Sequence, residues 1–106
     1  MENPVKDILN EDLVIKVLKT VFDPEIPVDI YELGLIYKII ITDRHVKVEM
    51  TLTAPNCPEA QSIPLNAKER IEQLQGVDSA EVEIVWEPRW NPDMMSEEAK
   101  LTIGYF

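Results

Sequence analysis

The feature that most constrains the fold is an alternating segment that runs into a corner containing a cysteine. From Val46 to Thr53 apolar and polar residues alternate strictly, which is typical of a β-strand with one buried and one polar face. The next five residues are Ala54-Pro55-Asn56-Cys57-Pro58, and a segment with apolar residues at helical spacing follows them. Proline suits the first position of a helix, because its φ is already helical and that position needs no N–H. The sequence therefore predicts a strand-to-helix corner, with Cys57 at or next to the start of the helix.

The chemistry of Cys57 has two interpretations at this point. It is the only cysteine in the chain, and a lone cytosolic cysteine is commonly a small buried hydrophobe. At a helix start, however, unpaired N–H groups and the positive end of the helix dipole favour a thiolate. Thr51, Thr53 and Asn56 could donate hydrogen bonds to such a sulfur anion. We therefore expect a reactive or metal-ligating thiol, and the structural alternative stays open.

The remaining patterns predict the order helix, strand, strand, helix, strand, followed by a short helix that Ser96 caps. Helices on one face of a small antiparallel or mixed sheet would give an α+β two-layer sandwich. A last edge strand is expected from Leu101 to Phe106. The expected helices are Asn10 to Phe22 and Pro58 to Gln75, and the expected strands are Leu35 to Thr42, Val46 to Thr53 and Asp78 to Trp86.

Finer expectations concern the strands. The segment from Leu35 to Thr42 is apolar on both faces in places, which favours an inner strand or one that is covered twice. It should form an antiparallel hairpin with the next strand, with Asp43 or His45 in an unusual backbone conformation. His45 is expected as a solvated turn residue at the end of the hairpin opposite Cys57, and Trp86 is expected to point inward.

Length and composition restrict the class of protein. With 106 residues, of which 45% are apolar, we expect a single domain spanning residues 1–106. No apolar run is long enough for a transmembrane helix, and the N-terminus does not resemble a signal peptide, so a cytoplasmic location is expected. The net charge of −10 makes nucleic acid and anionic membranes poor partners.

An acidic loop precedes the first strand. The run from Asp23 to Asp29 holds two prolines and the carboxylates of Asp23, Glu25 and Asp29. One interpretation is a turn in which the Asp side chains accept hydrogen bonds from nearby N–H groups. The other is a carboxylate set held near a metal ion or a thiol.

The C-terminal segment also has two interpretations. It contains Trp90, Met94 and Met95 among prolines and acidic residues. The segment could be a flap that closes the core. Alternatively it could lean on the cysteine corner or form a partner-binding surface, to which exposed Trp90, Met94 and Met95 would be suited.

Several site types are absent from the sequence. It has no glycine-rich phosphate loop, no nucleophile elbow, no cysteine pair and no His-x-x-x-His, which excludes a closed zinc site within one chain. Cys57 could bind metal only with carboxylates, an outside thiol or a second subunit. In a homodimer, two Cys57 thiolates could share one cluster, and such an incomplete ligand set suits transient handling of metal.

Three blocks of sequence resemble a known family in the same order along nearly the whole chain. They are D-P-E-I-P-V-D-I-Y-E-L-G-L-I-Y (Asp23 to Tyr37), M-T-L-T-A-P-N-C-P (Met50 to Pro58) and W-E-P-R-W-N-P-D-M-M-S-E-E-A-K (Trp86 to Lys100). The chain resembles the iron-sulfur cluster assembly domain family, which includes SufT-like proteins, the cytosolic iron-sulfur targeting factor and PaaD.

This resemblance implies a non-enzymatic factor that assists assembly, transfer or targeting of iron-sulfur clusters. Its implied partners are cluster carrier or scaffold proteins and recipient apo-proteins, and its implied cargo is a transient cluster or iron. Cys57 would be the reactive centre, with Asp23, Glu25, Asp29 and Thr53 around it. The alternative is a PaaD-like accessory subunit of a metallo-oxygenase with a structural cysteine, but the extra C-terminal cysteines of that type are absent here.

Overall fold

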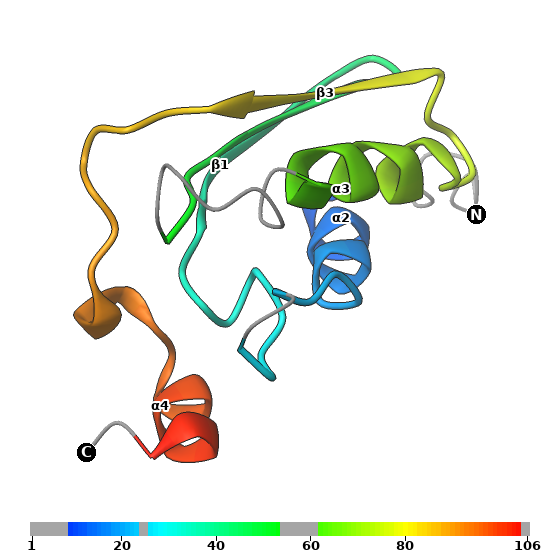
Figure 1. Ribbon diagram of the computed structural model, residues 1–106. Helices are drawn as coiled ribbons and strands as arrows, with labels where there is room; N and C mark the ends of the chain where they lie inside the picture. Colours follow the sequence, from blue (N-terminus) through cyan, green and yellow to red (C-terminus); the bar gives the residue numbers. More distant parts are fainter. Residues whose placement is uncertain (1–8, 24–25, 54–61, 105–106) are drawn as a thin grey trace.

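The computed structural model describes residues 9–23, 26–53 and 62–104. In this part of the chain two helices lie against one face of a three-stranded sheet, and the C-terminal segment extends away from them to a further short helix (Figure 1). The predicted α+β layer architecture is therefore confirmed.

The sheet is mixed, with the strand order β1-β2-β3. Strands β1 (Ile36–Thr42) and β2 (His45–Met50) form the expected antiparallel hairpin, and β3 (Ser79–Ile84) lies parallel to β2. The parallel pairing follows from the crossover through a helix, which returns the chain to the same end of the sheet. Asp43 takes the left-handed conformation in the hairpin turn, with φ of 55°, as expected for Asp or His at this turn.

Helices α2 (Glu11–Leu18) and α3 (Ser62–Glu72) supply the apolar layer beneath the sheet. The carboxamide of Asn10 caps α2 by accepting a 3.0 Å hydrogen bond from the N–H of Leu13. Alternate residues of β2 point into this layer and are fully buried. The core is built from Val14, Leu18, Ile30, Leu33, Leu35, Val46, Val48, Met50, Ile63, Ala67 and Ile71.

Both predicted helices are longer than the observed ones. α2 ends at Leu18, not at Phe22, because Lys19 forms its C-cap and Phe22 pairs with Asp29 in an isolated antiparallel bridge. The described part of α3 ends at Glu72, not at Gln75, and a tighter turn leads to Gly76 at φ of 98°. The expected helix start at Pro58 lies outside the described residues.

Three expectations about the strands were wrong. β1 is an edge strand among the described residues, so Ile40 on its outer face is 36% exposed. His45 begins β2 instead of lying in the turn, and its Nδ1 is 2.7 Å from Oγ of Ser79. Trp86 lies beyond the end of β3, whose regular part ends at Ile84, and it is 45% exposed.

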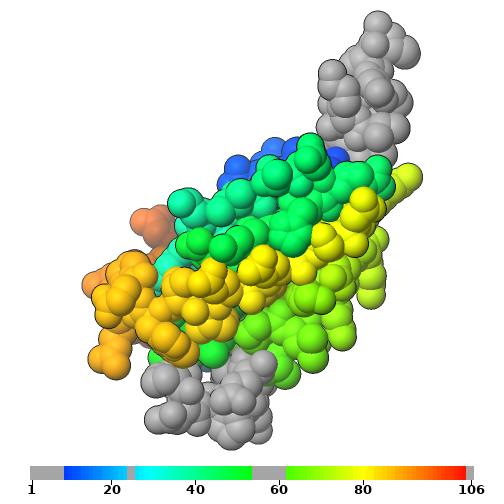
Figure 2. Space-filling view, turned by 90° about the horizontal axis from the view of Figure 1, so that it is seen from above, coloured from blue at the N-terminus to red at the C-terminus, as the bar shows by residue number. Residues whose placement is uncertain are grey.

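The outer face of the sheet is polar. Figure 2 shows β1, β2 and β3 side by side on this face, from blue-green through green to yellow. Lys47 and Glu83 form an ion pair of 3.1 Å across neighbouring strands, and Glu81 lies 3.6 Å from His45. The Lys47–Glu83 pair matches opposite charges across the sheet, but it is solvent-exposed and contributes little to stability.

The last predicted strand, Leu101 to Phe106, was also wrong. Leu101 lies within helix α4 (Glu97–Ile103), whose N-cap Ser96 accepts a 3.1 Å hydrogen bond from the N–H of Ala99. Acidic residues in the first turn favour the helix as well, as the sequence predicted for its start. Gly104 ends the helix at φ of 72°. No helix in the described segments is long and apolar enough to cross a bilayer.

Candidate functional site

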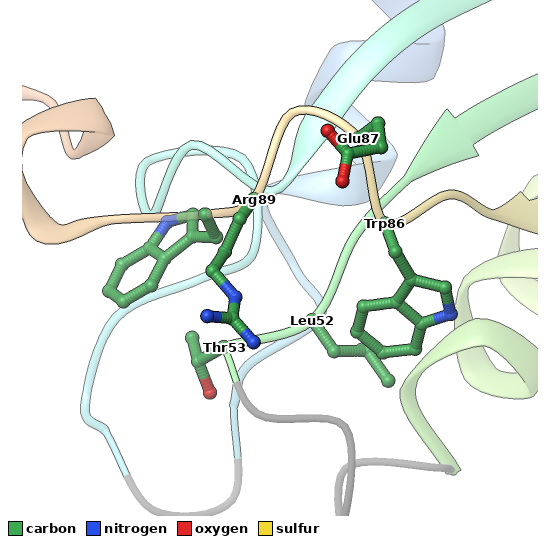
Figure 3. A pocket seen from close by; sticks show the side chains of 6 residues that line it. Leu52, Thr53, Trp86, Glu87 and Arg89 are labelled. Atoms are coloured by element: carbon green, nitrogen blue, oxygen red, sulfur yellow. The ribbon is translucent and has the colours of Figure 1, made fainter.

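A cavity of about 390 Å³ lies where strands β2 and β3 end (Figure 3). Thr53 on its wall is the last described residue before the segment 54–61. Asn56 and Cys57 belong to that segment, so both lie outside the described residues and their roles stay predictions. The cavity is lined by Leu52, Thr53, Trp86, Glu87, Arg89 and Trp90.

Backbone hydrogen bonds fix the strand ends that shape this pocket. The N–H of Thr51 donates to the carbonyl of Leu35 at 2.9 Å, and the N–H of Val85 donates to the carbonyl of Met50 at 2.8 Å. These two bonds continue the β1-β2 and β2-β3 pairing past the regular strands. The chain entering the cysteine segment is therefore held at a defined place beside the residues that follow β3.

One cation and one exposed indole dominate the pocket. The side chain of Arg89 points toward Thr53 and Leu52, and Glu87 lines the pocket farther from these two residues (Figure 3). Among the described residues Arg89 has no ion-pair partner, in contrast to Arg44, which lies 3.2 Å from Asp78. Within the described part of the chain, the pocket thus presents an unpaired guanidinium beside apolar surface, which suits an anionic group.

Thr51 contributes a second unsatisfied polar group at the strand end. Its side chain is fully buried, and its hydroxyl has no hydrogen-bond partner among the described residues. A buried hydroxyl without a partner costs about 1–3 kcal/mol. Whether Thr51 donates to the sulfur of Cys57, as expected, depends on residues outside the described part, so this role stays a prediction.

The acidic loop is built as a turn. Oδ1 of Asp23 accepts a 3.2 Å hydrogen bond from the N–H of Ile26, and Oδ2 of Asp29 accepts 3.0 Å bonds from the N–H groups of Tyr31 and Glu32. These bonds confirm the interpretation that the Asp side chains satisfy nearby backbone groups. Glu25, the third carboxylate of the predicted set, lies outside the described residues.

Asp23 and Asp29 do not line the pocket beside Thr53. Asp29 instead lines a second cavity, of about 230 Å³, together with Phe22, Glu32 and Glu98. Burial raises the pKa of Asp29, partly opposed by hydrogen bonds from the backbone. Across the described ranges no three His, Asp, Glu or Cys residues are grouped so that they could hold a metal ion.

The structure does not expose all three of Trp90, Met94 and Met95, as the alternative of a partner-binding surface required. Met95 is only 5% exposed and belongs to the hydrophobic core. Nε1 of Trp90 donates a 2.7 Å hydrogen bond to the carbonyl of Leu33, and the sulfur of Met94 accepts a 3.5 Å bond from the hydroxyl of Tyr37. These contacts tie the C-terminal segment, including the 3₁₀ helix η1 (Pro92–Met94), to the domain.

Sequence reasoning missed Arg89 and the exposed face of Trp86. Both belong to the block W-E-P-R-W, in which we considered the tryptophans but not the cation between the two indoles. The signal was the spacing: Arg89 is one residue from Trp90 and three from Trp86, directly after a predicted strand. In a chain with twice as many acidic as basic residues, a cation among aromatic residues is informative.

The fold and pocket define a class: a small α+β domain in which the only thiol of the chain follows in sequence a strand end beside a pocket, whose cation has no ion-pair partner in the described segments. The profile of the iron-sulfur cluster assembly protein family matches residues 11–84. The chain belongs to this family, and the resemblance seen in the three sequence blocks is confirmed.

The relatives agree with this assignment. A protein of Porphyromonas gingivalis, named Fe-S protein maturation auxiliary factor, is 48% identical over 90% of this chain and 91% of its own length. The Fe-S protein maturation auxiliary factor SufT of Staphylococcus aureus is 42% identical over 79% of this chain and 97% of its own. The crystal structure of a domain of unknown function from Bacillus anthracis has a TM-score of 0.84 and 34% identity, covering 91% of this chain and 92% of that one.

Proposed function

We propose that this protein is an iron-sulfur protein maturation factor, which assists assembly, transfer or targeting of clusters to recipient proteins through the thiol of Cys57. The observation that carries the proposal is the family match, which spans residues 11–84 and therefore includes the cysteine segment. Relatives that cover nearly the same length bear maturation-factor names, and this supports the same role here.

The chemistry expected of Cys57 is reversible ligation of iron. The cluster or iron is the cargo of the protein, and one thiolate per chain leaves most of its coordination positions for other ligands. A thiolate at the start of a helix would be stabilised by the nearby N–H groups, which would keep it available at neutral pH. An incomplete ligand set favours handing the cargo on, whereas four thiolates from one chain would hold it.

The expected partners are cluster carrier or scaffold proteins, which would supply the cargo, and recipient apo-proteins, which would take it. A homodimer would bring two Cys57 thiolates to one cluster. We place this activity in the cytoplasm, where thiols stay reduced. No catalytic step on a substrate is proposed, because the role consists of binding, presenting and releasing the cargo.

The proposal is tested by following cluster delivery under anaerobic conditions. A loaded carrier protein and the apo-form of a cluster enzyme are mixed with and without this protein, and recovery of the enzyme is timed. We expect wild-type protein to accelerate recovery and Cys57→Ser to abolish the acceleration. Equal acceleration by both would remove the thiol from the mechanism, and no acceleration by either would favour an accessory role with a structural cysteine.

A further inference from the structure

The pocket formed by Leu52, Trp86, Arg89 and their neighbours differs from the rest of this acidic protein. Its guanidinium has no ion-pair partner among the described residues, whereas the cations Lys19, Arg44, Lys47 and Lys68 each lie within 3.3 Å of a carboxylate. An arginine fork is suited to the two oxygens of a carboxylate, which it can bind with two parallel hydrogen bonds.

Much of the wall around Arg89 is apolar, although the polar residues Thr53 and Glu87 also line the pocket. Leu52 is almost fully buried, while 45% of the surface of Trp86 is exposed although its indole is large and hydrophobic. Nε1 of Trp90 already donates to the carbonyl of Leu33, so this ring offers the pocket only an apolar surface. A ligand that fits must therefore place a carboxylate beside an aromatic or branched aliphatic group.

The volume of the pocket admits a small ligand, but its few polar groups favour a side chain of a larger partner over a free metabolite. A volume of about 390 Å³ is at the lower end of the roughly 300–1,000 Å³ typical of ligand pockets. Small-molecule sites enclose their ligands and converge several polar groups on them, but here one cation is the main polar anchor. The net charge of −10 also opposes polyanions, which excludes nucleic acid as the anion.

From these contacts we propose that the Trp86–Arg89 pocket docks a partner protein through a segment in which an Asp or Glu lies next to an aromatic or aliphatic residue. This proposal rests on the proposed function, because the pocket adjoins the segment that carries Cys57, and the docked protein would be a carrier or a recipient. Arg89 would bind the carboxylate, and Trp86 with Leu52 would cover the apolar side chain.

Binding is measured by NMR with ¹⁵N-labelled protein and no metal present, so that the result is independent of cluster chemistry. The probe is the unlabelled peptide Gly-Leu-Glu-Phe-Gly with blocked ends, and the matched control replaces its Glu by Gln. We expect the Glu peptide to shift the Trp86 indole and Arg89 Nε signals and to bind at least tenfold more tightly than the Gln peptide. Equal binding of the two peptides would overturn the proposal.

Three variants locate the effect. Arg89→Ala should weaken binding of the Glu peptide at least tenfold, and Arg44→Ala, at an arginine paired with Asp78, should leave it unchanged. Arg89→Lys keeps the charge but not the fork and should give an intermediate affinity. Unchanged binding by Arg89→Ala would also overturn the proposal.

A third titration uses sodium 3-phenylpropionate, a free small carboxylate. Weaker binding of this acid than of the Glu peptide supports a docked protein segment, and binding as tight as the peptide's would assign the pocket to a small acid instead. Because none of these measurements involves iron, failure of the docking proposal would leave accelerated cluster delivery intact, and failure of delivery would leave the peptide result intact.

Discussion

Gly34 faces the backbone of Met94 so closely that a side chain cannot be placed between them. A Cβ added at Gly34 would lie 2.8 Å from the carbonyl carbon of Met94, and Gly34 has a φ of 82°. This contact joins the turn before β1 to the 3₁₀ helix of the C-terminal segment. The close approach explains why glycine is needed here. It also means that the position of the C-terminal segment depends on the loop that follows Asp29.

The variant Gly34→Ala should therefore be destabilised by two effects. The left-handed conformation costs an alanine about 1–2 kcal/mol, and the clash with Met94 adds to this by displacing the C-terminal segment. Urea unfolding should show a total loss of roughly 2–4 kcal/mol.

Gly104→Ala is the matched control for Gly34→Ala. Gly104 has a similar φ of 72°, but an added Cβ would meet nothing within 4 Å. It should lose only about 1 kcal/mol. Equal losses in the two alanine variants would contradict the importance of the Met94 contact.

Trp90 should stabilise the same junction through its hydrogen bond to Leu33. Trp90→Phe keeps an aromatic ring but leaves the Leu33 carbonyl without its 2.7 Å donor, which should cost about 1–2 kcal/mol. Trp86→Phe, at an exposed indole, should cost less than about 0.5 kcal/mol. Thermal unfolding of both variants measures the difference, and a larger loss in Trp86→Phe would contradict this account.

Thr51→Val should be neutral or stabilising if the Thr51 hydroxyl has no hydrogen-bond partner. The substitution keeps the side-chain shape and removes a buried hydroxyl that has no partner among the described residues, so the free energy of unfolding should rise by up to about 1–2 kcal/mol. A loss of stability would reveal a partner for this hydroxyl in the segment 54–61. Cluster delivery measured on the same variant separates this structural effect from the predicted donor role toward Cys57.

Asp29 and Glu32 should respond to pH with opposite signs. Hydrogen bonds from the Ser96 hydroxyl and from Lys19 lower the pKa of Glu32 below its ordinary value of 4.5. The stability that ionised Glu32 contributes is therefore fully present above pH 4.5, and it is lost as pH falls through the lowered pKa of the native state. Glu32→Gln should cost about 1 kcal/mol at neutral pH and much less in acid.

Burial raises the pKa of Asp29 above its ordinary value of 3.8, so the native state binds this proton more tightly than the unfolded state. Native stability therefore falls as pH rises through this pKa. As pH rises through this pKa, Asp29→Asn should therefore become more stable relative to wild type. Its amide oxygen can still accept the hydrogen bonds from the N–H groups of Tyr31 and Glu32. Unfolding curves measured from acid to neutral pH for both variants test the two signs, and the same sign in both would contradict the assigned causes.

Much of the fold could be predicted because local signals agreed with packing. The alternation from Val46 to Thr53 gave the central strand, and the caps at Asn10 and Ser96 marked the starts of two helices. The edge position of β1 was not predictable, because strand order depends on contacts distant in sequence and the isoleucines of β1 read equally well as an inner strand.

The site was predicted only in part. Thr53 lies at the pocket, but Asp23 and Asp29 are used to close a turn, which composition alone could not distinguish from a ligand set. Arg89 was overlooked because its role arises from the loop after β3, whose path local patterns do not determine.

The most direct test of the central proposal is the reactivity of the single thiol in the metal-free protein. The rate of alkylation of Cys57, measured against pH, should give an apparent pKa clearly below the free-thiol value of about 8.5, and the same sulfur should be protected when iron and sulfide are added anaerobically. A pKa at or above the free value, together with no protection by iron and sulfide, would contradict the account.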